Sequence, residues 1–136
     1  MPRKDNKEQA MNDCISLYTV ITVLLMHWFA DFYCQTDKQA KNKSTKFGAL
    51  IDHTSDYAFI MTIGCFVYGW LPRDTYNLSC FMWITFLLHT LIDMFTSKLN
   101  TYLWNKQKVH YFFVSIGFDQ FLHYVTLLGY IKLIGG

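Results

Sequence analysis

The stretch CISLYTVITVLLMHWFADFYCQT, residues 14–36, decides the fold class because it is long and almost free of charge. Its single acid is Asp31, it has no Lys or Arg, and residues 15–29 are apolar nearly all round. A soluble surface helix shows a polar stripe along one side, whereas a bilayer core needs about 20 apolar residues per helix. The stretch therefore predicts a membrane-spanning helix.

Three further stretches repeat this pattern. Residues 75–97 and 109–131 hold one acid each, Asp93 and Asp119, and residues 57–72 hold no charge. All 12 Lys and Arg residues lie outside these stretches, so charged connections dilute the mean hydropathy of the chain to +0.14. Pro72 and the terminal Gly135-Gly136 are expected helix stops.

We therefore predict an all-α fold, an integral membrane four-helix bundle. Connections this short make consecutive helices antiparallel neighbours, in up-down-up-down order. The predicted parts are a polar N-terminal tail over residues 1–13 and a domain over 14–136, with helices at about 15–36, 50–71, 76–98 and 110–133. The alternative is a soluble helical bundle with an unusually apolar core.

Composition also limits the partners. The chain has 136 residues, of which 52% are hydrophobic, and a formal net charge of +2. This excludes a disordered or nucleic-acid-coating chain, so the expected partner is the lipid bilayer, with no nucleic acid and with a homo-oligomer left open. The connections after the first and third helices hold seven basic residues, whereas the N-terminus, the turn at Arg73 and the C-terminus together hold five. This small difference favours a cytoplasmic position for the connections after the first and third helices.

The polar residues that interrupt the apolar runs are the candidates for a functional site. Four of the five histidines have an acid three or four positions away, and at a spacing of four both side chains project from one face of a helix. The pairs are His27-x3-Asp31, followed by Gln35; His53 beside Asp52 and Asp56; His89-x3-Asp93, followed by Lys98; and Asp119-Gln120-x2-His123.

These pairs share a depth in the predicted bundle. They lie late in the first and third helices and early in the second and fourth, so in an up-down-up-down arrangement all four fall at the same end. An unpartnered acid near mid-bilayer costs roughly 2.5–3.5 kcal/mol. Since no Lys or Arg lies within the spans, the acids are predicted to converge and to be compensated there.

A metal site is the most specific interpretation, because imidazoles and carboxylates are the usual ligands of zinc, manganese or iron. One or two divalent ions would be held by His27, Asp31, His53, His89, Asp93, Asp119 and His123, with Asp31, Asp93 and Asp119 as candidate catalytic groups. Gln35 and Gln120 would orient ligands, and Lys98 and Lys43 would contact an anionic headgroup. A proton or ion relay and polar contacts that merely fix helix packing remain alternatives.

The same residues carry a resemblance. The run His27-Trp28-Phe29-Ala30-Asp31-Phe32-x2-Gln35-Thr36-Asp37, with His53, His89-x3-Asp93-x4-Lys98 and Asp119-Gln120-x2-His123, resembles a family of small polytopic membrane proteins from bacteria and their phages. That family is a domain of unknown function, so the resemblance implies a multi-pass protein of the bacterial inner membrane, in some cases phage-encoded, and no established reaction. Membrane-bound metal-dependent hydrolases also place His and Asp motifs on helices, but their motif order is not reproduced here, so they support the chemistry by analogy only.

We therefore expect a metal-dependent membrane hydrolase that acts on a lipid-linked or membrane-adjacent phosphoester. The near absence of Glu favours hydrolysis over the oxygen chemistry of di-iron bundles, which use Glu-x-x-His spacing. The alternative is a non-enzymatic membrane effector, a proton-conducting or pore-forming oligomer whose His/Asp cluster is a relay or a structural polar core. A partner-binding module is a third alternative.

Overall fold

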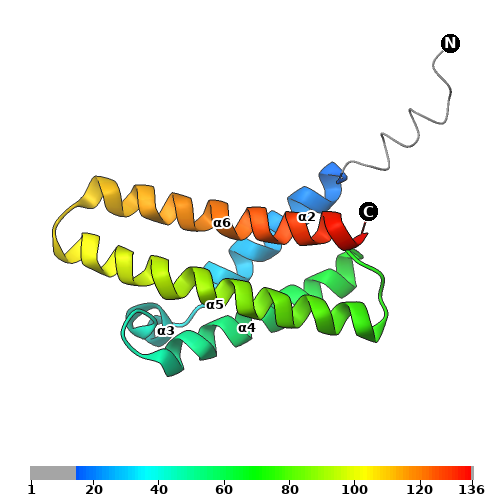
Figure 1. Cartoon of the computed structure of the whole chain (residues 1–136), viewed down its shortest axis with the longest axis horizontal. Helices are drawn as coiled ribbons and strands as arrows, with labels where there is room; N and C mark the ends of the chain where they lie inside the picture. The colour runs from blue at the N-terminus through cyan, green and yellow to red at the C-terminus, as the bar shows by residue number, and fades with distance from the viewer. Residues whose placement is uncertain (1–14, 136) are drawn as a thin grey trace, which may run out of the picture.

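The computed structural model describes residues 15–135, and these residues form helices joined by short turns (Figure 1). The all-α class predicted from the sequence is confirmed, whereas the predicted polar tail over residues 1–13 lies outside the described residues. The elements in chain order are α2 (Leu17–Trp28), a π-helical turn (Phe29–Tyr33), α3 (Asp37–Asn42), α4 (Phe47–Tyr68), α5 (Thr75–Asn105) and α6 (Val109–Gly135).

Local sequence signals set most of these helix ends. The Ser16 hydroxyl accepts a hydrogen bond from the Thr19 amide at 3.1 Å and begins α2, and the Asp74 carboxylate accepts one from the Asn77 amide at 2.9 Å and begins α5. Gly69 ends α4 with φ of 67°, a left-handed conformation that favours glycine.

The segment after α2 differs from the prediction. A single helix was expected over 15–36, followed by a basic loop, but the helix widens into the π-helical turn and ends at Tyr33. Thr36 and Gln39 then form a capping box that starts α3 inside the expected loop. The Gln39 amide also donates to the Asp56 carboxylate at 2.7 Å, which fixes α3 against α4.

In Figure 1, α5 lies between α4 and α6 and packs along both, and α2 crosses behind them in contact with α4 and α6. An apolar core fills the end of the molecule near the α4–α5 turn, where the Trp70 indole donates to the Thr22 hydroxyl at 2.9 Å. Its central members are Val23, Met61, Cys65, Trp70, Phe81, Leu127 and Ile131. The interior toward the other end is polar.

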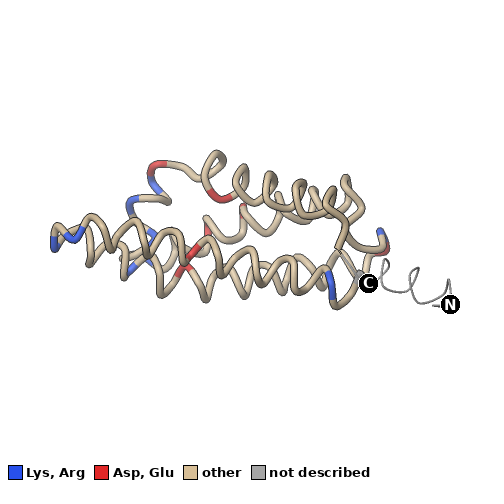
Figure 2. Tube along the Cα trace, turned by 90° about the horizontal axis from the view of Figure 1, so that it is seen from above, with Lys and Arg blue, Asp and Glu red and all other residues tan. Residues whose placement is uncertain are grey.

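The outer surface of the long helices is largely apolar, in contrast to this polar interior. Large hydrophobic side chains are exposed along every long helix, among them Leu25, Ile63, Phe66, Leu91, Phe95, Phe118 and Val125. Figure 2 shows most Lys and Arg toward the two ends of the molecule, with acidic residues and long stretches of uncharged residues between them.

Two of the described helices, α5 and α6, are long and apolar enough to cross a membrane. The prediction named four such helices. The first is shorter than expected because the apolar helix ends at Tyr33, and the first half of α4 carries Asp52 and Asp56.

Candidate functional site

The predicted His/Asp residues meet inside the molecule. His27 comes from α2, Asp31 from the π-helical turn, His53 from α4, and the other four come in pairs from α5 and α6. All are buried, with no residue more than 8% exposed. We call this set the His/Asp cluster: His27, Asp31, His53, His89, Asp93, Asp119 and His123.

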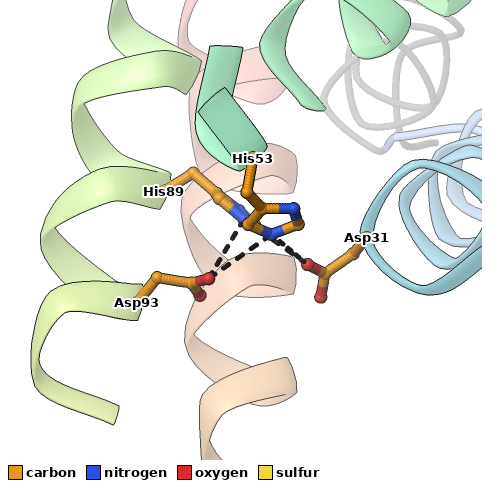
Figure 3. Close-up of side chains that lie close together, drawn as sticks. All are labelled: Asp31, His53, His89 and Asp93. Atoms are coloured by element: carbon orange, nitrogen blue, oxygen red, sulfur yellow. Dashed lines mark hydrogen bonds and ion pairs between the residues drawn. The ribbon is translucent and has the colours of Figure 1, made fainter. Parts of the chain in front are cut away.

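Four of these side chains form a compact group, which we call the four-residue group: Asp31, His53, His89 and Asp93 (Figure 3). The His53 Nε2 atom lies 3.1 Å from Asp31 Oδ1 and 3.4 Å from Asp93 Oδ2. The His89 Nε2 atom lies 3.5 Å and 3.7 Å from the same two oxygens, and 3.2 Å from His53 Nε2.

Five of the six separations among these four atoms are compatible with a tetrahedral ligand set. Ligand bonds of about 2.0–2.1 Å at tetrahedral angles place neighbouring ligand atoms roughly 3.3–3.4 Å apart. The five distances run from 3.1 to 3.7 Å and bracket that value. Two imidazole nitrogens and two carboxylate oxygens are thus placed so that they could hold one divalent ion.

The two aspartates of the four-residue group, Asp31 and Asp93, each use one carboxylate oxygen within that group and the other oxygen outside it. Asp93 Oδ1 lies 3.2 Å from His123 Nε2, and Asp31 Oδ2 accepts a hydrogen bond from the Gln120 amide at 3.1 Å. Asp31, Asp119 and His123 form a second group of adjacent ligand atoms. The two groups share Asp31, an arrangement that could hold a second ion beside the first.

His27 stands apart from both groups although it belongs to the cluster. Its Nδ1 atom is 2.6 Å from the Tyr57 hydroxyl, and its Nε2 atom is 2.8 Å from the Gln120 amide oxygen. Its nearest carboxylate oxygen, Asp31 Oδ2, is 3.7 Å away. With both ring nitrogens hydrogen-bonded, His27 orients Gln120 and, through it, Asp31.

Lys43, predicted to contact an anionic headgroup, brings a positive charge against the cluster. It lies just after α3, and its Nζ atom contacts Asp93 Oδ2 at 2.7 Å. Burial alone would lower the pKa of the Lys43 ammonium, but the Asp93 and Asp31 carboxylates outweigh burial and raise that pKa above its ordinary value. Lys43 lies outside the long helices, and in the structure the contact it makes is with Asp93 of the cluster, a contact that the sequence did not predict.

The remaining candidates divide into two sets. The Gln35 amide lies 3.2 Å from His53, and the Gln120 amide donates to both Asp31 and Asp119, so both glutamines contact the cluster. The structure does not bring Lys98 to the cluster; its side chain is exposed on α5. Asp52 and Asp56, which flank His53 in the sequence, are also exposed, as is His110, the fifth histidine.

Sequence reasoning missed two further members. Tyr57 is 1% exposed, bonds to His27 and stacks on the His89 ring with centroids 3.7 Å apart. The Thr96 hydroxyl donates to Asp119 Oδ1 at 2.6 Å. Tyr57 lies four residues after His53 on the same helix face, a spacing that could have indicated it.

A cavity of about 640 Å³ opens beside the cluster. Asp31, Asp119 and Gln120 line it from the cluster side, and Lys41 and Lys43 line it from the α3 side. A molecule in this cavity would therefore contact cluster carboxylates directly.

The fold and the site define an all-helical protein with a buried His/Asp cluster that could bind metal. The family model described as protein of unknown function (DUF3307) matches residues 19–134, so the chain belongs to this family, and the family resemblance is confirmed at that level. No curated protein and no solved structure shows significant similarity to the chain.

Proposed function

We propose that the protein is an integral membrane four-helix bundle, with antiparallel consecutive helices, that hydrolyses a phosphoester at a metal centre in the His/Asp cluster. The substrate is lipid-linked or lies next to the membrane. The observation that carries the proposal is the near-tetrahedral spacing of four buried ligand atoms from three separate segments of the chain. The family resemblance adds the bacterial inner membrane, in a host or phage context, as the expected location.

Support for the membrane comes from the distribution of polarity. Soluble monomers rarely expose contiguous apolar patches larger than a few hundred Å², yet here the long helices carry apolar side chains outward and polar ones inward. Intramembrane ionisable groups characteristically face the bundle interior and pair with one another. The Lys and Arg residues at the two ends fit positions near the headgroups.

Support for hydrolysis comes from the donor set and its neighbours. Two nitrogens and two oxygens suit zinc, manganese or iron, and such an ion lowers the pKa of a bound water toward neutrality. Asp119 lies outside the four-residue group and lines the cavity, which supports Asp119 as the group that takes the water proton. The water oxygen bonds to phosphorus, the bond to the leaving oxygen breaks, and Asp119 returns the proton to that oxygen.

The test is the metal content of the full chain purified in detergent, from cells supplied with zinc, manganese and iron. We expect at least one equivalent of one metal by elemental analysis in the wild type and in His110→Ala, which changes an exposed histidine. His89→Ala should lose most of that metal and its phosphoesterase activity. A wild type that carries no metal above background would contradict the proposal.

A proton relay is the second candidate, because titratable side chains lie in series from Asp31 through His53 and Asp93 to His123. Lys43 also compensates the acids without an ion. A relay predicts proton flux into liposomes that Asp31→Asn abolishes and that chelators leave unchanged. The hydrolase predicts no such flux.

A further inference from the structure

The residues that line the cavity beside the cluster belong to two chemical sets, which we call its polar half and its apolar half. The polar half consists of Lys41, Lys43, Ser97 and Asn100, together with the carboxylates of Asp31 and Asp119, which belong to the His/Asp cluster and which we call the inner wall. The other half is apolar, lined by Phe32, Phe113 and Trp104 among others. A ligand that fills the whole space must therefore be amphiphilic, with an anionic part near the lysines.

Two buried polar atoms in the polar half lack a partner. Ser97 is 7% exposed, and neither its Oγ atom nor the Asn100 Oδ1 atom has a hydrogen-bond partner within the described part of the chain. The two residues are three positions apart on α5, so their side chains lie on neighbouring positions of one helix face. Buried polar groups are normally satisfied, so these atoms indicate a ligand that supplies both an acceptor and a donor.

A phosphate headgroup meets these requirements. Its oxygens accept from the Ser97 hydroxyl and from the ammonium groups of Lys41 and Lys43, which are charge-assisted and therefore strong interactions. A protonated phosphate oxygen or a headgroup hydroxyl donates to the Asn100 amide oxygen. The inner wall then holds the phosphorus next to Asp31 and Asp119.

The apolar half specifies what the phosphate is attached to. Phe32 is 48% exposed and Phe113 is 63% exposed, so both reach the outer apolar surface while they line the cavity. A hydrocarbon chain attached to the headgroup would leave the cavity past these rings and reach the apolar outer surface. A free phosphate or a soluble phosphoester would leave this half unused.

We propose that the cavity binds a phosphate-bearing lipid, with its headgroup at Lys41, Lys43 and Ser97 and its chain leaving past Phe32 and Phe113. The hydrolysis of that lipid rests on the function proposed above, whereas its binding does not. The cavity residues therefore define the substrate class of the site.

The test uses two non-hydrolysable probes with the same headgroup, octylphosphonate and methylphosphonate, titrated calorimetrically into the full chain in detergent with EDTA. We expect octylphosphonate to bind at least about tenfold more tightly, since each buried CH₂ contributes to affinity. Equal affinities, or binding of methylphosphonate alone, would assign the cavity to soluble phosphate and overturn the proposal. No binding of either probe would overturn it as well.

Variants locate the binding. Lys41→Ala and Ser97→Ala should each weaken octylphosphonate binding at least about tenfold, as expected for loss of one hydrogen bond to a charged group. Lys46→Ala changes an exposed lysine outside the cavity lining and should not weaken binding. Phe113→Ser should weaken octylphosphonate and leave methylphosphonate unchanged. Equal losses in Lys41→Ala and Lys46→Ala would contradict the assigned site. Binding is measured in EDTA and therefore does not depend on a metal. If the protein binds octylphosphonate but purifies without metal, the hydrolase is refuted and the lipid site stands.

Discussion

His27 and His89 are both buried histidines one helical turn before an aspartate, yet they hold different positions in the cluster. His89 Nε2 belongs to the four-residue group, whereas both His27 nitrogens are hydrogen-bonded to Tyr57 and Gln120. We therefore expect His27→Ala to retain most of the bound metal and His89→Ala to lose it, in elemental analysis of matched preparations. Equal loss in both variants would place His27 among the ligands.

Lys43 places one positive charge against the cluster carboxylates through its ion pair with Asp93. Lys43→Met removes the partner of Asp93, and breaking a buried ion pair costs roughly 3–5 kcal/mol. Since the Lys43 side chain is 19% exposed, we expect about 2–3 kcal/mol lower stability in EDTA, measured by thermal unfolding in detergent. Added zinc or manganese should restore much of the loss, because a cation replaces the ammonium. The double variant Lys43→Met/Asp93→Asn should lose less stability and gain none from metal.

The same ion pair gives a pH dependence. The Asp93 and Asp31 carboxylates raise the pKa of Lys43 above its ordinary 10.5 although burial opposes this. Its stabilising contribution is therefore complete below pH 10.5 and is lost as pH rises through the raised pKa. The difference in unfolding free energy between wild type and Lys43→Met should shrink above that pH, while groups common to both proteins cancel. A difference that stays constant over this range would exclude the ion pair.

The sequence predicted which His and Asp residues share a helix face, because a spacing of four is a local property. It did not place Lys43 beside Asp93, fifty positions away. That contact depends on where α3 packs, and nothing near Lys43 in the sequence specifies it. The Tyr57 contact with His27 depends in the same way on the packing of α4 against α2.

At the level of elements, α3 positions Lys43. The Thr36 hydroxyl accepts from the Gln39 amide at 3.2 Å, and Gln39 Oε1 accepts from the Thr36 amide at 2.8 Å. Thr36→Ala removes half of this capping box at a cost of about 0.5–2 kcal/mol. We expect faster amide hydrogen exchange across 37–43 than in wild type, and Thr36→Ser should behave like wild type. Unchanged exchange in Thr36→Ala would mean that Gln39 contacts alone hold α3.

The boundaries of the elements were predicted unevenly. Long apolar runs identified α5 and α6, and Gly69 and Asp74 mark the turn before α5. The short α3 was missed because six residues give too little periodicity to detect. The π-helical turn was missed because the same apolar sequence suits either helix type, and tertiary contacts of Asp31 and Gln35 decide between them.

For the whole molecule, the decisive question is what covers the apolar outer surface. Leu91 is 51% exposed near the middle of α5, on the face opposite His89 and Asp93. Leu91→Lys should lower the stability of the inserted protein by roughly 2.5–3.5 kcal/mol if this surface lies in a bilayer. If the surface faces water, the substitution should change stability by no more than about 0.5 kcal/mol. We expect less protein in the carbonate-resistant membrane fraction for Leu91→Lys, and no change for Leu133→Lys near the end of α6. Equal behaviour of the two variants would contradict the membrane bundle.

The π-helical turn sets the angular position of the residues that directly follow it, as far as the start of α3. The Cys34 amide bonds to the Phe29 carbonyl, five residues back, at 3.0 Å, so this turn contains one residue more than an α-helical turn. Each helical residue advances the chain by about 100°, and a one-residue deletion would therefore swing Gln35 away from His53 and shift the start of α3 with it. The length of the segment from His27 to Gln35 should accordingly be invariant across the family, while the loops at the two ends of the molecule are free to vary.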